Sequence, residues 1–472
     1  MATPPSERHA PVQFLRALGP LEGVAIVVGT TIGSGIFLTP ATIAEKLGPY
    51  GFGAILGVWV LCGALSLAGA LAYAELGALF PRAGGQYVYL REAFGPLWGF
   101  LFGWVEFWVA RAGGIAAVAV AFARYVAVFT NQGGEWAERS TAFLAICVLT
   151  AVNYLGVRGG GAVQTLFTAT KVGALLALVI CSFGLPGGSA EHWQPLWNPA
   201  AGAAGLISAV GFAMVQSLWS YDGWTNGAAV SEEMKNPQRD VPRSLLIGTA
   251  IITAIYVSAN IAYHYVLPLE RIQGSERVAA DVAGRLFGSE VGVRLLAAAV
   301  LMSTFGAING SLLSGTRIFY AMARDGLFFQ EMGQLHLRFR SPHWSILFQG
   351  IWASALVLVP FDWVLNPLFH WKQEARLYDQ LLAYVVFASW AFYGLTVAGL
   401  FRLRMTQPDL PRPYSAWGYP VVPGLFVLTS GAFVLHTLVS QPGEALAGVA
   451  ILLLGIPAYR FWARRSAEPA QP

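Results

Sequence analysis

The chain has 472 residues, of which 56% are hydrophobic and only 11% are charged. Soluble domains carry about 25% charged residues, so this deficit excludes an ordinary soluble protein and predicts a polytopic α-helical membrane protein. The formal net charge of +4 does not indicate a nucleic-acid partner, because membrane proteins collect Lys and Arg in their cytoplasmic loops.

Twelve apolar segments are long enough to cross a bilayer. Several exceed the roughly 20 residues that a span needs, which indicates tilted or interrupted helices. The predicted spans cover residues 19–47, 51–79, 95–129, 139–157, 161–185, 204–232, 242–267, 291–324, 343–360, 377–401, 420–440 and 443–463.

The distribution of Lys and Arg predicts the orientation of these spans. With the N-terminus inside, cytoplasmic loops and tails hold about 18 of the 29 Lys and Arg residues. We therefore expect cytoplasmic tails at 1–18 and 464–472. We expect no cleaved signal peptide, because the first apolar segment is too long and lacks a cleavage site. The three cysteines fall inside predicted spans, so we expect neither a loop disulfide nor a metal site.

The first span places its weakest helix formers at its centre. Residues 29–37 read GTTIGSGIF, and each glycine lowers helix propensity by about 1 kcal/mol relative to alanine. Unwound backbone is tolerated at membrane depth only where it lines a cavity. We therefore predict a broken helix beside a cavity.

The sixth span has a second interruption, where residues 217–224 read SLWSYDGW. Asp222 in an apolar span costs about 2.5–3.5 kcal/mol, so it should face a cavity or a partner. Breaks in spans one and six are what two inverted five-helix repeats give, at 19–185 and 204–401, with 420–463 added. Packing of small residues between helices is the alternative for either break alone; two breaks at the repeat spacing favour a substrate site.

The two ends of a broken helix suit a zwitterion. The half-helix that starts near Ser34 presents N–H groups at its positive end, and the half that ends near Thr30 presents C=O groups at its negative end. A carboxylate and a neighbouring ammonium satisfy both at once. The sequence therefore favours an amino acid over a sugar or an inorganic ion.

Three of the further charges inside predicted spans are candidates for a functional role. Glu106 and Arg111 in the third span are five positions and about 140° apart on an α-helix, so we expect each to meet another helix. Structural bonding is favoured over direct involvement in transport. Lys171 lies near mid-membrane in the fifth span, where its stem does not easily reach an interface, which favours a functional charge over a snorkelling lysine.

Five stretches follow one another along the chain: GTTIGSGIF, PRAGGQYVYLREAFG, WVEFWVARAG with FARYV, YDGWTNGAAVSEEMKNPQRDVPRS and FGAINGSLLSGTRIFYAMARDG. Together they resemble the L-type amino acid transporters of the amino acid–polyamine–organocation superfamily, from about residue 15 to 463. The resemblance implies an all-α membrane protein with twelve transmembrane helices in a 5+5 inverted-repeat, LeuT-like fold. It also implies exchange or facilitated transport of L-amino acids without a cofactor.

The resemblance further implies a substrate site made by both broken spans. The residues concerned are, in span one, Thr30, Ile32, Gly33, Ser34 and Gly35 and, in span six, Ser217, Leu218, Trp219, Ser220, Asp222 and Thr225. In span six, backbone carbonyls would meet the ammonium and Trp219 would be an aromatic gate. Asp222 and Thr225 stand where animal members often have Gly and Asn, a departure that weakens the transfer of large-neutral specificity. A neutral L-amino acid is the expected substrate, and a cationic amino acid or polyamine, which Asp222 and Trp219 suggest, is the alternative.

Residues outside the broken spans complete the expected site. By resemblance, Lys171 reaches toward span one and stands where sodium-coupled relatives bind a cation, which predicts sodium-independent transport; a proton-linked role is the alternative. Span eight, with Ser303, Thr304 and Asn309, would pack near the site, although helix packing explains such a polar set equally well. In span ten, Phe387 and Trp390 are candidates for the side-chain pocket, unless they face lipid or the core.

The resemblance also bears on partners. Animal L-type carriers bond to a glycoprotein heavy chain through a cysteine in the loop after span three, and here that loop reads TNQGGEWAERS. We therefore expect a standalone carrier in the cytoplasmic (inner) membrane, as in prokaryotic members. We expect most charges of the loop SEEMKNPQRDVPRS to be exposed to solvent. The alternative is that Glu232, Glu233 and Arg239 contribute to an inner gate.

Three other functional classes fit less well. An amino-acid sensor on a transporter fold would need long cytoplasmic tails. A channel would need polar residues along a continuous pore rather than at two breaks. An enzyme would need a catalytic or metal constellation at one depth, and the seven histidines are scattered.

Overall fold

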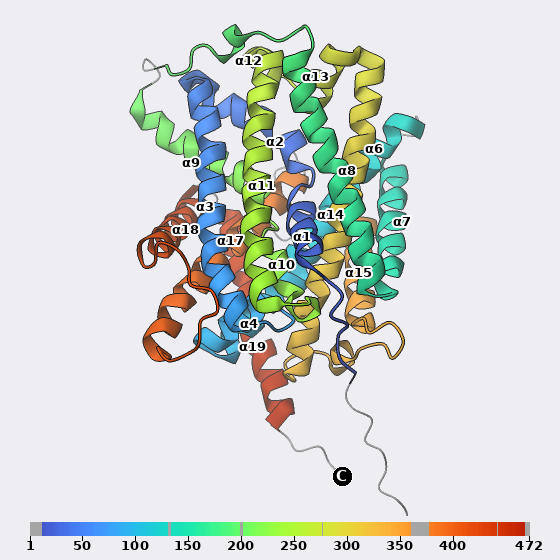
Figure 1. Ribbon diagram of the computed structural model, residues 1–472, viewed down its shortest axis with the longest axis vertical. Helices are drawn as coiled ribbons and strands as arrows, with labels where there is room; N and C mark the ends of the chain where they lie inside the picture. Colours follow the sequence, from blue (N-terminus) through green and yellow to red (C-terminus); the bar gives the residue numbers. More distant parts are fainter. Residues whose placement is uncertain are drawn as a thin grey trace, which may run out of the picture.

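The computed structural model describes residues 12–130, 134–198, 202–275, 277–359, 377–440 and 442–467. These residues form a bundle of helices that run mostly along its long axis (Figure 1), and their β-pairing is limited to one isolated bridge between Leu18 and Met234. Seven helices of the described residues are long and apolar enough to cross a membrane, or eight if the bent pair α1–α2 is one span. The helical membrane class is confirmed, and the number of twelve spans stays a prediction.

Every predicted span contains at least one helix. The long elements are α1 (Pro20–Thr31), α2 (Gly35–Leu47), α3 (Phe52–Leu79), α5 (Pro96–Val105), α6 (Arg111–Thr130), α7 (Glu135–Tyr154), α8 (Val157–Gly184), α9 (Ala203–Tyr221), α11 (Pro237–Val266), α14 (Ser289–Arg324), α15 (His343–Leu358), α17 (Leu377–Thr406), α18 (Val421–Ser440) and α19 (Pro442–Ala467). The shorter helices are α4 (Gln86–Phe94), α10 (Asn226–Ala229), α12 (Leu269–Gln273) and α13 (Val278–Phe287).

Both interruptions predicted from the sequence are present. Helix α1 ends at Thr31 and α2 begins at Gly35, and the two halves meet at a bend of 44°. Helix α9 ends at Tyr221, and the chain turns through Gly223 at φ +112° before α10 begins. Glycine adopts this left-handed backbone without the steric cost that a Cβ brings.

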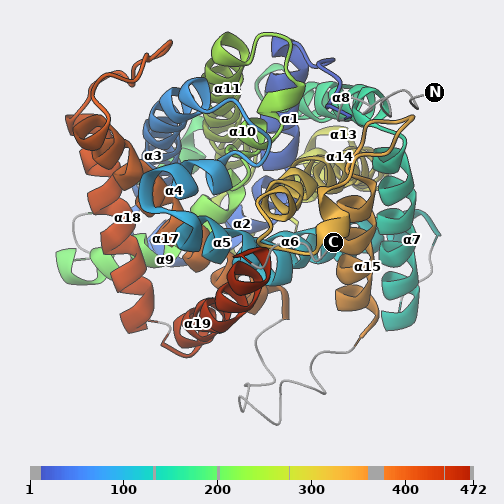
Figure 2. The same cartoon turned by 90° about the horizontal axis from the view of Figure 1, so that it is seen from below.

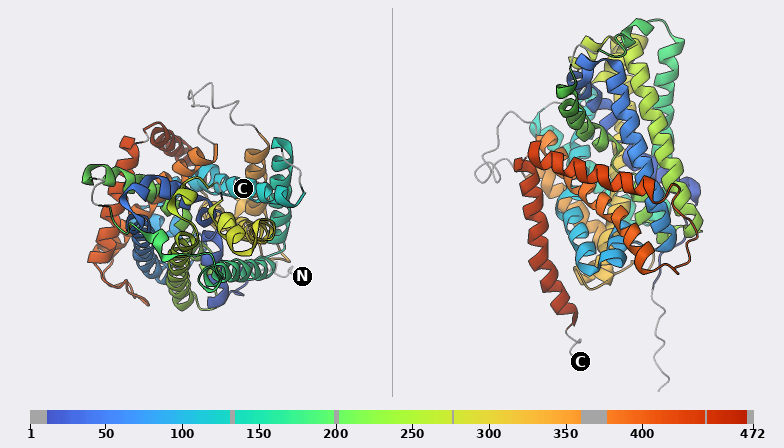
Figure 3. Two further views of the ribbon diagram at one scale, coloured as in Figure 1. Left: turned by 90° about the horizontal axis from the view of Figure 1, so that it is seen from above. Right: turned by 90° about the vertical axis from the view of Figure 1, so that its left-hand side faces the viewer.

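Helix α1 lies inside the bundle. It packs against α8, α11 and α14, and α2 packs against α9 (Figure 2). The close approach of α1 to α8 depends on Gly29, because a Cβ there would lie 2.1 Å from the side-chain nitrogen of Gln164 and the hydroxyl of Thr168. Helices α18 and α19 lie on the outside, next to α17 (Figure 3). The two breaks therefore lie inside the bundle, whereas the first half of α9 reaches its outside, where Ile207 is 76% exposed.

Candidate functional site

Both helix breaks open on one small cavity near the middle of the bundle, which we call the central cavity. Its volume is about 80 Å³, and its walls come from the two breaks, the α5–α6 junction, α14 and α17. The lining residues are Thr30, Thr31, Gly33, Ser34, Gly35, Glu106, Ala110, Arg111, Gly114, Val118, Trp219, Ser220, Asp222, Gly223, Asn226, Ala307, Ser311, Ser389 and Tyr393.

Hydrogen bonds tie the two breaks to each other. The hydroxyl of Thr30, in the last turn of α1, lies 2.7 Å from the carbonyl of Ile26 and 3.1 Å from that of Gly223. Tyr256 of α11 bridges both sides, because its hydroxyl lies 3.1 Å from the carbonyl of Thr31 and 2.8 Å from that of Ser220. The breaks therefore form one hydrogen-bonded unit.

Lys171 of α8 binds the backbone of the first break. Its Nζ donates to the carbonyls of Gly29 at 2.8 Å, Ile32 at 2.6 Å and Ser303 at 2.7 Å, and the residue is 1% exposed. The Ser303 hydroxyl lies 2.9 Å from the same Ile32 carbonyl. A cation here complements the negative end of α1. Ile32 thus contributes its carbonyl to Lys171, and it does not line the central cavity.

Glu106 and Arg111 pair with each other, so the expectation that they do not was wrong, although Arg111 also meets another helix, α10, as expected. Arg111 Nη2 lies 2.8 Å from Glu106 Oε2, and Nη1 donates to Asn226 Oδ1 at 2.8 Å. The reason is a π-helical turn over Glu106–Ala110, which adds one residue to the turn and brings positions five apart onto one face. Both charged groups line the central cavity.

Asp222 caps the end of α9 at the second break. Tyr393 of α17 donates its hydroxyl to Asp222 Oδ1 at 2.5 Å, and both side chains line the central cavity. Among the described residues, the cavity therefore presents two carboxylates, of Glu106 and Asp222, against the single guanidinium of Arg111.

Some residues expected at the site lie beside the cavity instead. Ser217 and Leu218 are buried within α9, and Thr225 precedes α10; none of the three lines the cavity. Ser220 does line it, but its carbonyl already accepts the Tyr256 hydroxyl.

The expected side-chain pocket at Phe387 and Trp390 is not where the sequence placed it. Trp390 stacks on Phe426 of α18 with ring centroids 5.5 Å apart, and Phe387 lies against Gly448 of α19. The cavity-facing side of α17 carries Ser389 and Tyr393 instead. The two aromatic residues therefore belong to the packing of α17 on the outer helices.

The polar residues of α14 divide between the break and helix packing. Thr304 bonds to the Val300 carbonyl of its own helix at 2.8 Å. Asn309 accepts from Asn153 and donates to Gln164, both at 2.9 Å, and so joins α14 to α7 and α8. Only Ser303 of this group contacts the broken span.

A second, larger cavity lies on the side of the bundle where α12 is found, and we call it the outer cavity. Its volume is about 890 Å³. On α9 its wall includes Gln216, one turn from Ser220 of the central cavity, and on α6 it includes Ala121, one turn from Val118. Arg124 and Glu138 in its wall form an ion pair at 3.3 Å. Trp219 lines the central cavity and lies on α9 between Gln216 and Ser220.

The opposite side, where α4 and α10 lie, is closed by what we call the inner closure: residues 14–18, residues 231–235 and the end of α14. Arg317 binds Glu233 through two hydrogen bonds of 2.9 and 3.0 Å, and their side chains are 0% and 1% exposed. The amide of Leu18 donates to the Glu233 carbonyl at 3.0 Å. Phe14 packs edge-on against Tyr320 with ring centroids 4.9 Å apart.

Only part of the inner closure was predicted. Glu233 belongs to it, and Glu232 accepts the Ala83 amide at 3.1 Å, whereas Arg239 is exposed at the start of α11. Arg317 was not among the predicted site residues, although a charge within an apolar segment is a signal that points to it. Asn226 and Tyr393 were not predicted either. Asn226 follows Thr225 directly and Tyr393 lies one turn after Trp390, so both are neighbours of residues that were predicted.

Comparison with known proteins shows the family of the chain. A sequence model described as amino acid permease matches residues 18–456. The chain is 33% identical to the human b(0,+)-type amino acid transporter 1, with 98% of this chain and 93% of the relative covered. It is 32% identical to the human cystine/glutamate transporter (97% and 86% covered) and 33% identical to the mouse large neutral amino acids transporter small subunit 2 (95% and 81% covered). The chain belongs to the amino acid permease family of the amino acid–polyamine–organocation superfamily, whose members are membrane transporters and not enzymes.

Proposed function

We propose that this chain is a secondary transporter that moves L-amino acids by alternating access. The observation that carries the proposal is the meeting of both helix breaks on one cavity, between an outer cavity and the buried inner closure. Broken helices at corresponding positions of two repeats are the best pointer to a transporter's substrate site. The architecture we propose has twelve spans in two inverted repeats, 19–185 and 204–401, with 420–463 added.

The backbone at the breaks supports recognition of the α-carboxylate and α-ammonium groups. Ser34 and Gly35 open α2, whose first N–H groups form a positive end beside the cavity. Asp222 stands across the same cavity, at the end of α9. In this proposal the α2 end takes the carboxylate, and the ammonium lies on the α9 side.

Two substrate classes follow from the same cavity. The relatives' names include large neutral amino acids and the pair cystine and glutamate, so similarity supports amino acids as a class without choosing a side chain. A neutral substrate suits the pairing of Glu106 with Arg111, which leaves that pair without net charge. A cationic substrate or polyamine is the second candidate, and Asp222 is the observation that favours it.

Lys171 supports sodium-independent transport. The three carbonyls that it binds are the type of ligand that a sodium ion would need, and a fixed ammonium already occupies them. We further propose exchange or facilitated transport in the cytoplasmic membrane, with both termini inside. We propose no disulfide-linked heavy chain, because the loop at 130–140 has no cysteine.

Uptake into proteoliposomes tests these points together. A labelled amino acid is competed with each of the twenty amino acids and putrescine, in empty and in preloaded vesicles, with sodium or with choline outside. We expect competition by a subset of amino acids, stimulation by preloading if the carrier is an exchanger, and unchanged uptake in choline. A strict sodium requirement would overturn the role given to Lys171, and no uptake of any amino acid would overturn the function.

The role of Asp222 has its own test in the same assay. In Asp222→Asn the side chain keeps its shape and loses its charge. If Asp222 selects cations, arginine and putrescine lose at least about tenfold in apparent affinity relative to leucine, since 1.4 kcal/mol is a factor of ten. An unchanged preference would leave only the neutral class.

A further inference from the structure

A third cavity lies on the lipid-facing side of the bundle, next to the inner closure and away from the proposed substrate path. It measures about 690 Å³ and is formed by the chain before α1, the first turns of α1 and α8, and Lys235. We call it the basic groove. Its lining residues are Arg16, Ala17, Leu18, Glu22, Val157, Arg158, Gly161, Ala162, Thr165, Leu166 and Lys235.

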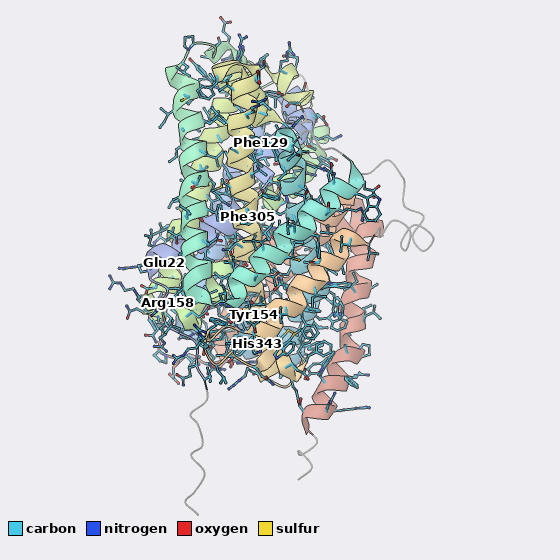
Figure 4. The ribbon with its side chains drawn as sticks, turned by 90° about the vertical axis from the view of Figure 1, so that its right-hand side faces the viewer. Glu22, Phe129, Tyr154, Arg158, Phe305 and His343 are labelled. Carbon is cyan, nitrogen blue, oxygen red and sulfur yellow. The ribbon has the colours of Figure 1, made fainter. Side chains whose placement is uncertain are left out.

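Positive charge dominates the basic groove. Arg16, Arg158 and Lys235 are exposed, and among the described residues none of them forms an ion pair. Glu22 is the single acid in the lining, and its carboxylate accepts the Gly19 amide at 2.9 Å at the start of α1. Figure 4 shows Glu22 and Arg158 near each other at the edge of the bundle, in its lower half. Three cations therefore face this space against one carboxylate that already caps a helix.

The walls combine charge with apolar surface as a lipid site does. The groove includes the first turn of α8, where the N–H groups of Val157 and Arg158 begin the helix and favour an anion. Leu166, a little more than two turns further along α8, lines the groove and is 61% exposed, and Leu21 of α1 is 67% exposed. The cationic end of the groove thus continues into an exposed apolar surface at Leu166 and Leu21.

We propose that the basic groove binds the phosphate headgroup of an anionic phospholipid, with its acyl chains along α1 and α8. Basic pockets between transmembrane helices on the cytoplasmic side are suited to such headgroups. The location in the inner leaflet rests on the orientation proposed above, and the binding itself does not. A free phosphate compound shares the headgroup chemistry but lacks the apolar contact with Leu166 and Leu21.

The occupied groove would stabilise the inner closure. The Lys235 amide donates to the Leu18 carbonyl at 2.8 Å, so two groove residues are also partners within the closure. A phosphate held by Arg16, Lys235 and Arg158 links the chain before α1 to residues 231–235 and to α8. Separation of these segments, which inward opening requires, then breaks the site.

Native mass spectrometry of the full chain in neutral detergent tests the proposal with short-chain phosphatidylglycerol. We expect retention of this lipid, and no comparable retention of the matching phosphatidylcholine. The variant Arg16→Gln/Arg158→Gln/Lys235→Gln should bind phosphatidylglycerol on the order of a hundredfold more weakly. The control Arg460→Gln/Arg464→Gln/Arg465→Gln loses the same charge from exposed positions on α19 and should bind as the wild type does.

A second variant separates binding from misfolding. In Glu22→Gln the amide oxygen still accepts the Gly19 N–H while the negative charge is lost, so phosphatidylglycerol should bind more tightly than to wild type. Undiminished binding by the triple variant, or equal loss in the α19 control, would overturn the proposal. Glycerol 3-phosphate that displaces the lipid at equal concentration would overturn the lipid as occupant in favour of a free phosphate compound. None of these measurements depends on transport, so the proposed function can fail separately.

Discussion

At the scale of single residues, the most informative group is the Lys171 ammonium. Three backbone carbonyls surround it, and no carboxylate among the described residues balances its charge. The charge is therefore neutralised by the negative end of α1 and by the broken backbone itself. This arrangement makes the lysine part of the break rather than of a separate ion pair.

Substitution of Lys171 should disable the break. In Lys171→Met the carbonyls of Gly29, Ile32 and Ser303 lose the ammonium, and only that of Ile32 keeps the Ser303 hydroxyl described above as a second donor. A buried polar group that is left unsatisfied costs about 1–3 kcal/mol. We expect uptake to fall at least about tenfold and the thermal unfolding midpoint to drop. Lys46→Met is the control, because Lys46 is exposed and lies over the Phe212 ring at 5.2 Å. Full activity of Lys171→Met would show that the ammonium is dispensable.

The pair Glu106–Arg111 offers a prediction that separates charge pairing from packing. Breaking a buried pair by removing one partner costs about 3–5 kcal/mol, whereas removing both charges costs less. Glu106→Gln and Arg111→Met alone should therefore destabilise the protein more than the double variant does. Thermal unfolding of the four proteins measures this coupling. Strictly additive effects would mean that the two groups do not interact.

The same pair marks a limit of sequence analysis. From a regular α-helix, Glu106 and Arg111 point about 140° apart, and no residue of EFWVA announces the π-helical turn that brings them together. Tertiary packing determines that turn. Arg317 shows a different limit, because its partner Glu233 is 84 positions away and only the folded chain brings the two together.

At the scale of elements, the sequence predicted the breaks but not the surfaces around them. Poor helix formers and an intramembrane acid are local signals, so α1–α2 and α9–α10 were predictable to within a few residues. Which face of α17 meets the cavity was not, since aromatic residues pack equally well against a ligand or a neighbouring helix. Trp390 packs against Phe426 of α18, whereas Tyr393, one turn later, donates its hydroxyl to Asp222.

Two glycines of the first break should respond differently to alanine. A Cβ on Gly35 would lie 2.8 Å from the backbone Cα of Ser220, so α2 must move away from α9. A Cβ on Gly33 would meet only the Ala307 methyl, at 3.8 Å. We expect Gly35→Ala to lose about 1–3 kcal/mol of stability and most transport. Gly33→Ala should retain its unfolding midpoint and change mainly the substrate affinity. Equal midpoints for the two variants would contradict this packing argument.

At the scale of the whole molecule, the two ends of the bundle differ. The α12 side holds a cavity of about 890 Å³, whereas the α4 side is sealed by a buried ion pair, backbone hydrogen bonds and aromatic contacts. In the proposed function and orientation, this asymmetry corresponds to an outward-facing carrier. The proposed transport cycle then requires the inner closure to separate, which breaks the buried ion pair Glu233–Arg317.

Weakening that contact should shift the carrier toward an inward-open state. Loss of one partner costs the closed state about 3–5 kcal/mol, and about 5.5 kcal/mol converts a 1:99 population to 99:1. We place a reporter cysteine at Ala307 in the central cavity, with Cys62, Cys147 and Cys181 replaced by serine. Labelling by an impermeant maleimide from the α4 side should accelerate at least tenfold in Arg317→Met.

Arg404→Met is the matched control, because Arg404 binds Glu75 at the same end but joins α17 to α3, outside the inner closure. The Arg404→Met variant should have a lower thermal unfolding midpoint but no faster labelling. Equal acceleration of labelling in both variants would mean that this end of the bundle loosens as a whole. Glu233–Arg317 would then have no special role as a gate.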